Sequence, residues 1–244
     1  MRMILAVFAA ALALAASSPV RAADAPQPSG WKAVLIAGSD RELAFDNAVD
    51  AMALKLASFG VPPGDIVELK SSSDDEEEAA TRHNIDAAFV GLHPGPHDGC
   101  FVFVTSHGMA GRGLVISRAR AFLSPQTLAM LLDRSCGTRP TVVIASGCFS
   151  GIFTDGPSLV ASNRAILAAA RDDRPSFGCD ASREYTVFDQ CILGNLVRGE
   201  TWRTVMGKTR ACVSGNEFDL HVTKPSDPQL AIGTAVAGLR VFAR

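Results

Sequence analysis

The chain has 244 residues, 48% of them hydrophobic, and a formal net charge of −2 at pH 7. This length and composition suffice for one substantial domain with a full core. With 23 basic against 25 acidic residues, the chain lacks the basic excess of a nucleic-acid-binding protein, so we expect no nucleic-acid partner.

The first 22 residues have the pattern of a secretory signal peptide. A short basic start precedes an apolar run from Ile4 to Ala16, which is shorter than the roughly 20 residues that span a bilayer. Small residues follow at the positions that a signal peptidase reads. We expect cleavage after Ala22, with Ala23 as the second choice and a retained membrane anchor as the alternative. The predicted parts are a signal peptide (1–22), a flexible leader (23–30) and one domain (31–244), exported to the periplasm or secreted, without membrane insertion after cleavage.

The first half of the domain alternates between strand and helix signals. Residues 32–38 form a short apolar run typical of a buried strand, and residues 65–69 predict a second one. Between them, apolar residues recur at helical spacing: Phe45, Val49, Met52, Leu56 and Phe59. The acidic run at 71–78 leads into further apolar residues, and we interpret it as the negatively charged start of a helix. An acidic binding tract is the alternative interpretation.

The second half continues this alternation. We predict strands at 100–105, 141–146 and 164–170, helices at 124–134, 185–198 and 200–213, and a last strand or helix at 231–242. The strands are continuous apolar runs, which is typical of a mainly parallel sheet covered on both faces. The expected fold is therefore a three-layer α/β/α sandwich, with its chemistry beyond the carboxyl ends of the strands.

The six cysteines indicate disulfides if the chain is exported. They are Cys100, Cys136, Cys148, Cys179, Cys191 and Cys212. No two of them form a CxxC pair, which disfavours a thiolate zinc site. We expect Cys100 to pair with Cys136, because each precedes a strand and those strands could be neighbours.

Two of the predicted strands are each followed by one potentially reactive side chain. The strand at 100–105 leads to His107 and Gly108, and the strand at 141–146 leads to Cys148. A cysteine nucleophile needs a base, which is usually histidine, and donors for the oxyanion. The backbone N–H groups of Gly108 and Cys148 could be those donors. The pattern predicts an acyl-transfer site.

Both segments resemble motifs of the legumain-type cysteine peptidases (peptidase family C13), which belong to the caspase-like clan. Thr-Ser-His-Gly-Met-Ala-Gly at 105–111 is similar to the histidine motif of the family, and Ala-Ser-Gly-Cys-Phe-Ser-Gly at 145–151 is similar to its cysteine motif. Residues 169–190 resemble the segment that builds the pocket for the residue before the scissile bond. The likeness spans roughly residues 31–200 and implies a caspase-like fold.

The chain departs from the family at several positions. Ser146-Gly147 stands where the family usually has Glu-Ala, and Asp46-Asn47 stands where eukaryotic legumains have Arg-His. We expect a bacterial-type exported member without the long C-terminal propeptide of plant and animal legumains. Asparagine specificity is therefore not carried over from the family.

The resemblance implies a cysteine endopeptidase that acts on peptides or proteins through His107, Cys148 and Gly108, with no metal or organic cofactor. Ser176, Asp189 and Asp46 would line the substrate pocket, and two carboxylates there would suit a basic P1 residue such as Arg. Two alternatives remain open: a transamidase or peptide ligase that uses the same acyl-enzyme, and a catalytically inactive caspase-fold peptide-binding protein. The oligomeric state is not predicted.

Overall fold

The computed structural model describes residues 27–179 and 183–243. The expected signal peptide and its cleavage position after Ala22 lie outside these residues. Among the described residues, no helix combines the length and the apolar composition needed to cross a bilayer.

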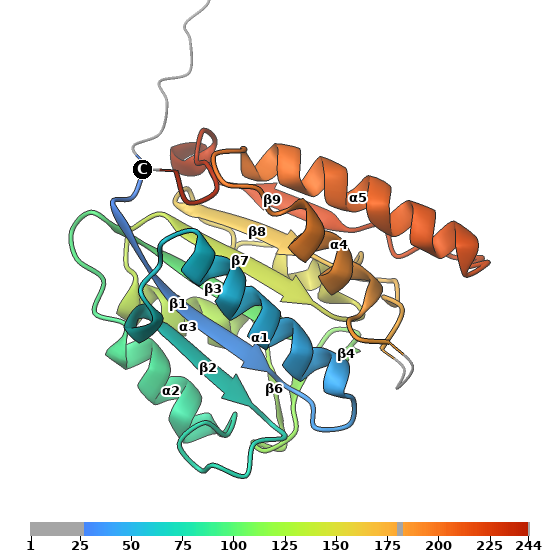
Figure 1. Cartoon of the computed structure of the whole chain (residues 1–244), viewed down its shortest axis with the longest axis horizontal. Coiled ribbons are helices and arrows are strands. Elements are labelled where there is room, and N and C mark those ends of the chain that lie inside the picture. Colours follow the sequence, from blue (N-terminus) through green and yellow to red (C-terminus); the bar gives the residue numbers. More distant parts are fainter. Residues whose placement is uncertain (1–26, 180–182, 244) are drawn as a thin grey trace, which may run out of the picture.

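The core of the fold is a six-stranded sheet in the order β2-β1-β3-β7-β8-β9 (Figure 1). Its strands are β1 (Gly30–Ala37), β2 (Ile66–Lys70), β3 (Asp98–Thr105), β7 (Thr141–Ser146), β8 (Arg164–Ala168) and β9 (Gln229–Ile232). All neighbouring pairs are parallel except β8 with β9. The prediction of a mainly parallel sheet is therefore confirmed.

Helices cover both faces of the sheet. They are α1 (Leu43–Ser58), α2 (Arg82–Gly91), α3 (Pro125–Ser135), α4 (Val187–Asn195) and α5 (Trp202–Asp219). Figure 1 shows α1, α4 and α5 on one face and α2 and α3 on the other. Side chains of a strand alternate between these faces, so Leu35 packs with the first group and Ile36 with the second. This is the predicted three-layer α/β/α sandwich.

Two disulfides lie on opposite faces of the sheet. Cys100–Cys136 joins the start of β3 to the C-cap of α3, which confirms the predicted pair. Cys191–Cys212 joins α4 to α5. The second pair was not predicted, because cysteine spacing alone does not select one pairing among several.

Two segments differ from the sequence-based expectation. The acidic run at 71–78 does not start a helix, since α2 begins only after Thr81, whose side-chain oxygen accepts a hydrogen bond from the Asn84 N–H at 3.1 Å. The run is instead a loop that returns to the end of β2, where the Lys70 N–H donates to the Glu78 carbonyl. The Thr81 cap and the backbone hydrogen bond between Lys70 and Glu78 thus determine where the helix begins.

The second difference is a small antiparallel sheet in the glycine-rich segment after β3. It consists of β4 (Gly108–Met109), β5 (Gly113–Ile116) and β6 (Ala121–Leu123). These strands are too short for a periodic sequence signal. At the C-terminal end, β9 is followed by the short 3-10 helix η3 (Thr234–Val236), so the apolar segment at 231–242 closes the fold only in part as a strand.

Candidate active site

Pairing of β3 with β7 sets the geometry of the candidate site. The two strands are parallel neighbours, and their last residues, Thr105 and Ser146, are register partners. His107 and Cys148 therefore each follow two residues beyond the ends of adjacent strands. The two segments remain joined past the sheet, where the Ser106 N–H donates to the Ser146 carbonyl at 3.0 Å. The predicted adjacency of the two strands is confirmed.

Gly108 and Gly147 allow the two segments to approach at backbone distance. A Cβ atom on Gly108 would lie 1.8 Å from the carbonyl oxygen of Cys148, and one on Gly147 would lie 2.5 Å from the carbonyl oxygen of Ser106. No side chain fits at these distances. The N–H groups of Gly108 and Cys148, the expected oxyanion donors, therefore belong to two segments in direct contact.

Cys148 is a half-buried free thiol at a sharp turn. The next residue, Phe149, has left-handed backbone angles (φ 60°, ψ 17°), and the 3-10 helix η2 (Ser150–Phe153) follows it. A bulky residue in this region costs on the order of 1 kcal/mol. The Phe149 N–H is fixed by the Arg174 carbonyl at 2.8 Å. This turn holds the thiol at the end of β7.

Ser176 lies directly beside the thiol. Its backbone N–H donates to Cys148 Sγ at 3.3 Å, and its carbonyl oxygen is 3.5 Å from the same sulfur. The Ser176 hydroxyl oxygen is 3.8 Å from Sγ. The structure thus brings this predicted pocket residue into contact with the candidate nucleophile.

The imidazole of His107 contacts an acid that the sequence analysis did not single out. His107 Nε2 is 2.8 Å from Glu42 Oε2, and the two side chains are 31% and 21% exposed. The ring also meets Phe45 edge-on, with the ring centroids 5.2 Å apart. Glu42 precedes α1 by one residue, and no local pattern marks it, because it reaches His107 only through the pairing of β1 with β3.

Asp189, another predicted pocket residue, is completely buried beneath the strand ends. Its Oδ2 accepts a hydrogen bond from the Thr105 hydroxyl at 2.6 Å, and the hydroxyls of Ser146 and Thr186 also lie close to the carboxyl group. Its Oδ1 has no well-formed hydrogen bond within the described residues. Burial raises the pKa of this carboxyl group, and the neighbouring hydroxyls offset that rise in part.

Asp46 lies in the first turn of α1 and is 9% exposed. Its Oδ2 accepts a hydrogen bond from the Ser72 hydroxyl. Burial raises the pKa of Asp46, and this hydrogen bond and the charge of Lys70 oppose the rise. In the described part of the chain, Asp46 and Asp189 share no hydrogen-bond partner. The structure therefore brings Ser176 to the thiol and leaves the two acids in separate buried positions.

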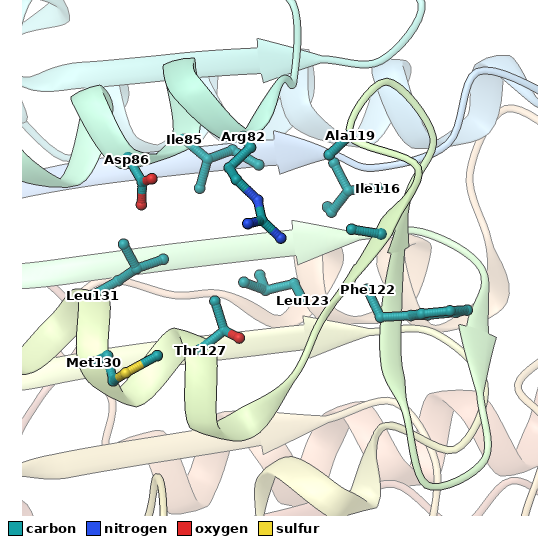
Figure 2. Close-up of a pocket in the computed structure, with 11 residues that line it drawn as sticks. Arg82, Ile85, Asp86, Ile116, Ala119, Phe122, Leu123, Thr127, Met130 and Leu131 are labelled. Atoms are coloured by element: carbon teal, nitrogen blue, oxygen red, sulfur yellow. The ribbon is translucent and has the colours of Figure 1, made fainter.

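An apolar groove between α2, α3 and the β5–β6 hairpin lies away from these residues. It encloses about 270 Å³ (Figure 2). Its lining residues are Arg82, Ile85, Asp86, Ile116, Ala119, Ala121, Phe122, Leu123, Thr127, Met130 and Leu131. Neither His107 nor Cys148 is among them, so this groove is not where acyl transfer would occur.

A protein-family model matches part of the chain. The model of the Peptidase C13 family matches residues 79–202, about half of the chain, and this stretch contains both His107 and Cys148. No curated protein sequence matches the chain significantly.

Similar solved structures include two forms of an insect caspase. Caspase-1 from Spodoptera frugiperda is 15% identical with a TM-score of 0.63, and the match covers 93% of this chain and 97% of that one. A structure of pro-sf-caspase-1 is 11% identical with a TM-score of 0.58, covering 86% and 96%. At this level of identity the likeness establishes a caspase fold alone.

Proposed function

Because the chain belongs to the peptidase C13 family, we propose that it is a cysteine endopeptidase that hydrolyses peptide bonds through Cys148 and His107. The observation that carries this proposal is the in-register pairing of β3 and β7, which end at Thr105 and Ser146. Equivalent positions beyond two adjacent parallel strands suit a nucleophile and its base.

The proposed reaction has two steps through an acyl-enzyme. The thiol of Cys148 gives its proton to His107 and its sulfur attacks the scissile carbonyl carbon, forming a C–S bond. The N–H groups of Gly108 and Cys148 donate to the oxyanion, and the C–N bond breaks as His107 protonates the leaving amine. A water molecule deprotonated by His107 then attacks the thioester, the C–S bond breaks, and the thiolate recovers the proton.

The proposed substrates are peptides or proteins with a basic residue, such as Arg, before the scissile bond. Asp46 supports this preference, since its Oδ1 lacks a hydrogen bond within the described residues and could accept one from a guanidinium group. Asp189 is fully buried beneath the strand ends, so it does not support the preference. Equal cleavage of matched Asn and Arg peptides would count against this preference.

The proposal includes export to the periplasm or secretion. The signal-peptide pattern at 1–22 and the Cys100–Cys136 and Cys191–Cys212 disulfides support it, because disulfides persist in oxidising compartments. Fractionation of cells that express the full chain tests it: the processed protein should appear outside the cytoplasm, with an N-terminus near residue 23 in Edman sequencing.

The central test combines peptide cleavage with labelling by a thiol-reactive peptide probe. Cys148→Ala should abolish both, and His107→Ala should reduce both by at least about 100-fold. His97→Ala, which changes an exposed histidine outside the site, is the matched control and should leave both unchanged. Cleavage that persists in Cys148→Ala would contradict the proposed nucleophile.

The same assay separates the alternatives. An added amine nucleophile that captures most of the acyl product would indicate a transamidase or ligase in place of a hydrolase. Probe-resistant Cys148 together with peptide binding would indicate a catalytically inactive binding protein.

A further inference from the structure

The contact between Glu42 and His107 involves only one of the two imidazole nitrogens. Glu42 Oε2 lies 2.8 Å from Nε2 of the imidazole. Within the described residues, the other ring nitrogen, Nδ1, makes no hydrogen bond. The carboxylate therefore occupies one side of the ring and leaves the other nitrogen for a different partner.

Glu42 stands at the N-cap of α1 but does not cap the helix. Its backbone is extended (φ −127°, ψ 128°), and its side chain accepts no hydrogen bond from the first turn. The N-cap residues of the other described α-helices all accept such a bond: Thr81, Ser124, Thr186 and Thr201. Short side chains are favoured at this position because they reach back to the backbone. At α1, the longer glutamate side chain is directed to His107 instead.

The first turn of α1 fixes the imidazole through a second contact. Phe45 follows Glu42 by three positions and therefore lies on the same face of the helix start. Its buried ring meets the His107 ring edge-on, with an interplanar angle of 81°. A hydrogen bond at the ring edge and an aromatic contact together restrict both the rotation and the tilt of the imidazole.

We propose that Glu42 is a positioning residue that holds neutral His107 in the Nε2–H tautomer. This inference rests on the proposed peptidase function. With the Nε2 proton donated to Glu42, the lone pair of Nδ1 is the base that takes the thiol proton of Cys148. The same nitrogen then gives that proton to the leaving amine. The proton moves only between sulfur, Nδ1 and the amine, and Glu42 stays ionised throughout.

The tautomer can be measured directly by NMR, without any catalytic activity. The protein carries Cys148→Ala and is labelled with ¹⁵N at the histidine rings, and His107 is assigned among the five histidines by comparison with His107→Gln. In the neutral ring, we expect a protonated Nε2 and a bare Nδ1. Glu42→Ala should give a mixture of tautomers, whereas Glu42→Gln should keep the Nε2–H form, because its amide oxygen still accepts the hydrogen bond.

Kinetics of the same variants in the chain with intact Cys148 form the second arm. Glu42→Ala should lower kcat on the order of 10- to 100-fold, the loss expected for one hydrogen bond to a charged group, with little change in KM. Glu42→Gln should recover most of that loss. Asp40→Asn removes a neighbouring exposed acid and is the matched control, with kcat expected within about twofold of the unmodified chain.

The NMR and kinetic experiments together distinguish the positioning role of Glu42 from the proposed peptidase function. An Nδ1–H tautomer in the unmodified ring, or an unchanged kcat in Glu42→Ala, would overturn the positioning role. If the tautomer responds as expected but no variant cleaves peptides, the positioning role stands and the peptidase proposal fails.

Discussion

Asp189 offers the sharpest test of how the fold supports the candidate site. The carboxyl group is fully buried and accepts a 2.6 Å hydrogen bond from the hydroxyl of Thr105. The side chain of Ser146 also lies within reach. Thr105 and Ser146 end β3 and β7, so Asp189 ties together the two strands that carry His107 and Cys148. Replacing it should therefore weaken both the fold and the site.

The cost of Asp189→Ala follows from the groups that lose their partner. Thr105 and Ser146 are 0% and 2% exposed, so water cannot replace the carboxyl group at their hydroxyls. One unsatisfied buried polar group costs about 1–3 kcal/mol. With two such groups, the free energy of unfolding should fall by about 2–6 kcal/mol. Asp189→Asn keeps an acceptor oxygen and should cost much less.

The pH dependence of stability distinguishes the two variants further. Burial raises the pKa of Asp189 above its ordinary value of 3.8. Between the ordinary pKa of the unfolded chain and the raised pKa of the folded chain, the folded state binds a proton that the unfolded state has lost. The contribution of Asp189 to stability therefore decreases as the pH rises. The slope approaches about 1.4 kcal/mol per pH unit. Asp189→Asn removes this titration, so its stability relative to the unmodified chain should increase as the pH rises above about 4.

Urea denaturation across a pH series measures this difference. The exposed Asp155 provides a control, since Asp155→Asn removes the same charge without removing a buried group. A stability difference between Asp189→Asn and the unmodified chain that stays constant with pH would refute the reasoning about desolvation. A loss below about 1 kcal/mol in Asp189→Ala would refute the reasoning about unsatisfied hydroxyls.

Three further predictions follow from contacts in the structure. Gly108→Ala should lower kcat by at least about 100-fold in peptide kinetics, because its Cβ would lie 1.8 Å from the Cys148 carbonyl oxygen. The control Gly207→Ala, in open space on α5, should stabilise the chain by about 0.5–1 kcal/mol in urea denaturation. Replacing Cys191 and Cys212 together by Ser should lower the free energy of unfolding by about 3 kcal/mol, the value for a closed loop spanning 21 positions, and an unchanged urea midpoint would contradict it. Asp46→Asn should lower kcat/KM for Arg peptides about 10-fold or more relative to Asn peptides, and an equal loss for both would remove Asp46 from the P1 preference.

The order of elements in the domain could be predicted from the sequence because it depends on local signals. The strand at 141–146 has a continuous apolar centre and is observed with the same bounds. The helix opened by Ser124-Pro125 is observed from Pro125, with Ser124 as its cap. The positions of His107 and Cys148 just past strand ends follow from the same runs. Periodicity and capping act within a few residues, so one segment suffices to detect them.

The partners of these residues were decided by tertiary structure. Glu42 reaches His107 across 65 positions of the chain, and Asp189 reaches Thr105 across 84. Neither contact leaves a local pattern, because each arises from the order in which β1, β3 and β7 pair and from how α1 and α4 pack on them. The sequence alone determined which side chains could perform the chemistry and at which edge of the sheet they would lie. Only the folded chain decided which acid faces the imidazole and which is buried under the strands, since long-range packing selects among many carboxylates that are locally equivalent.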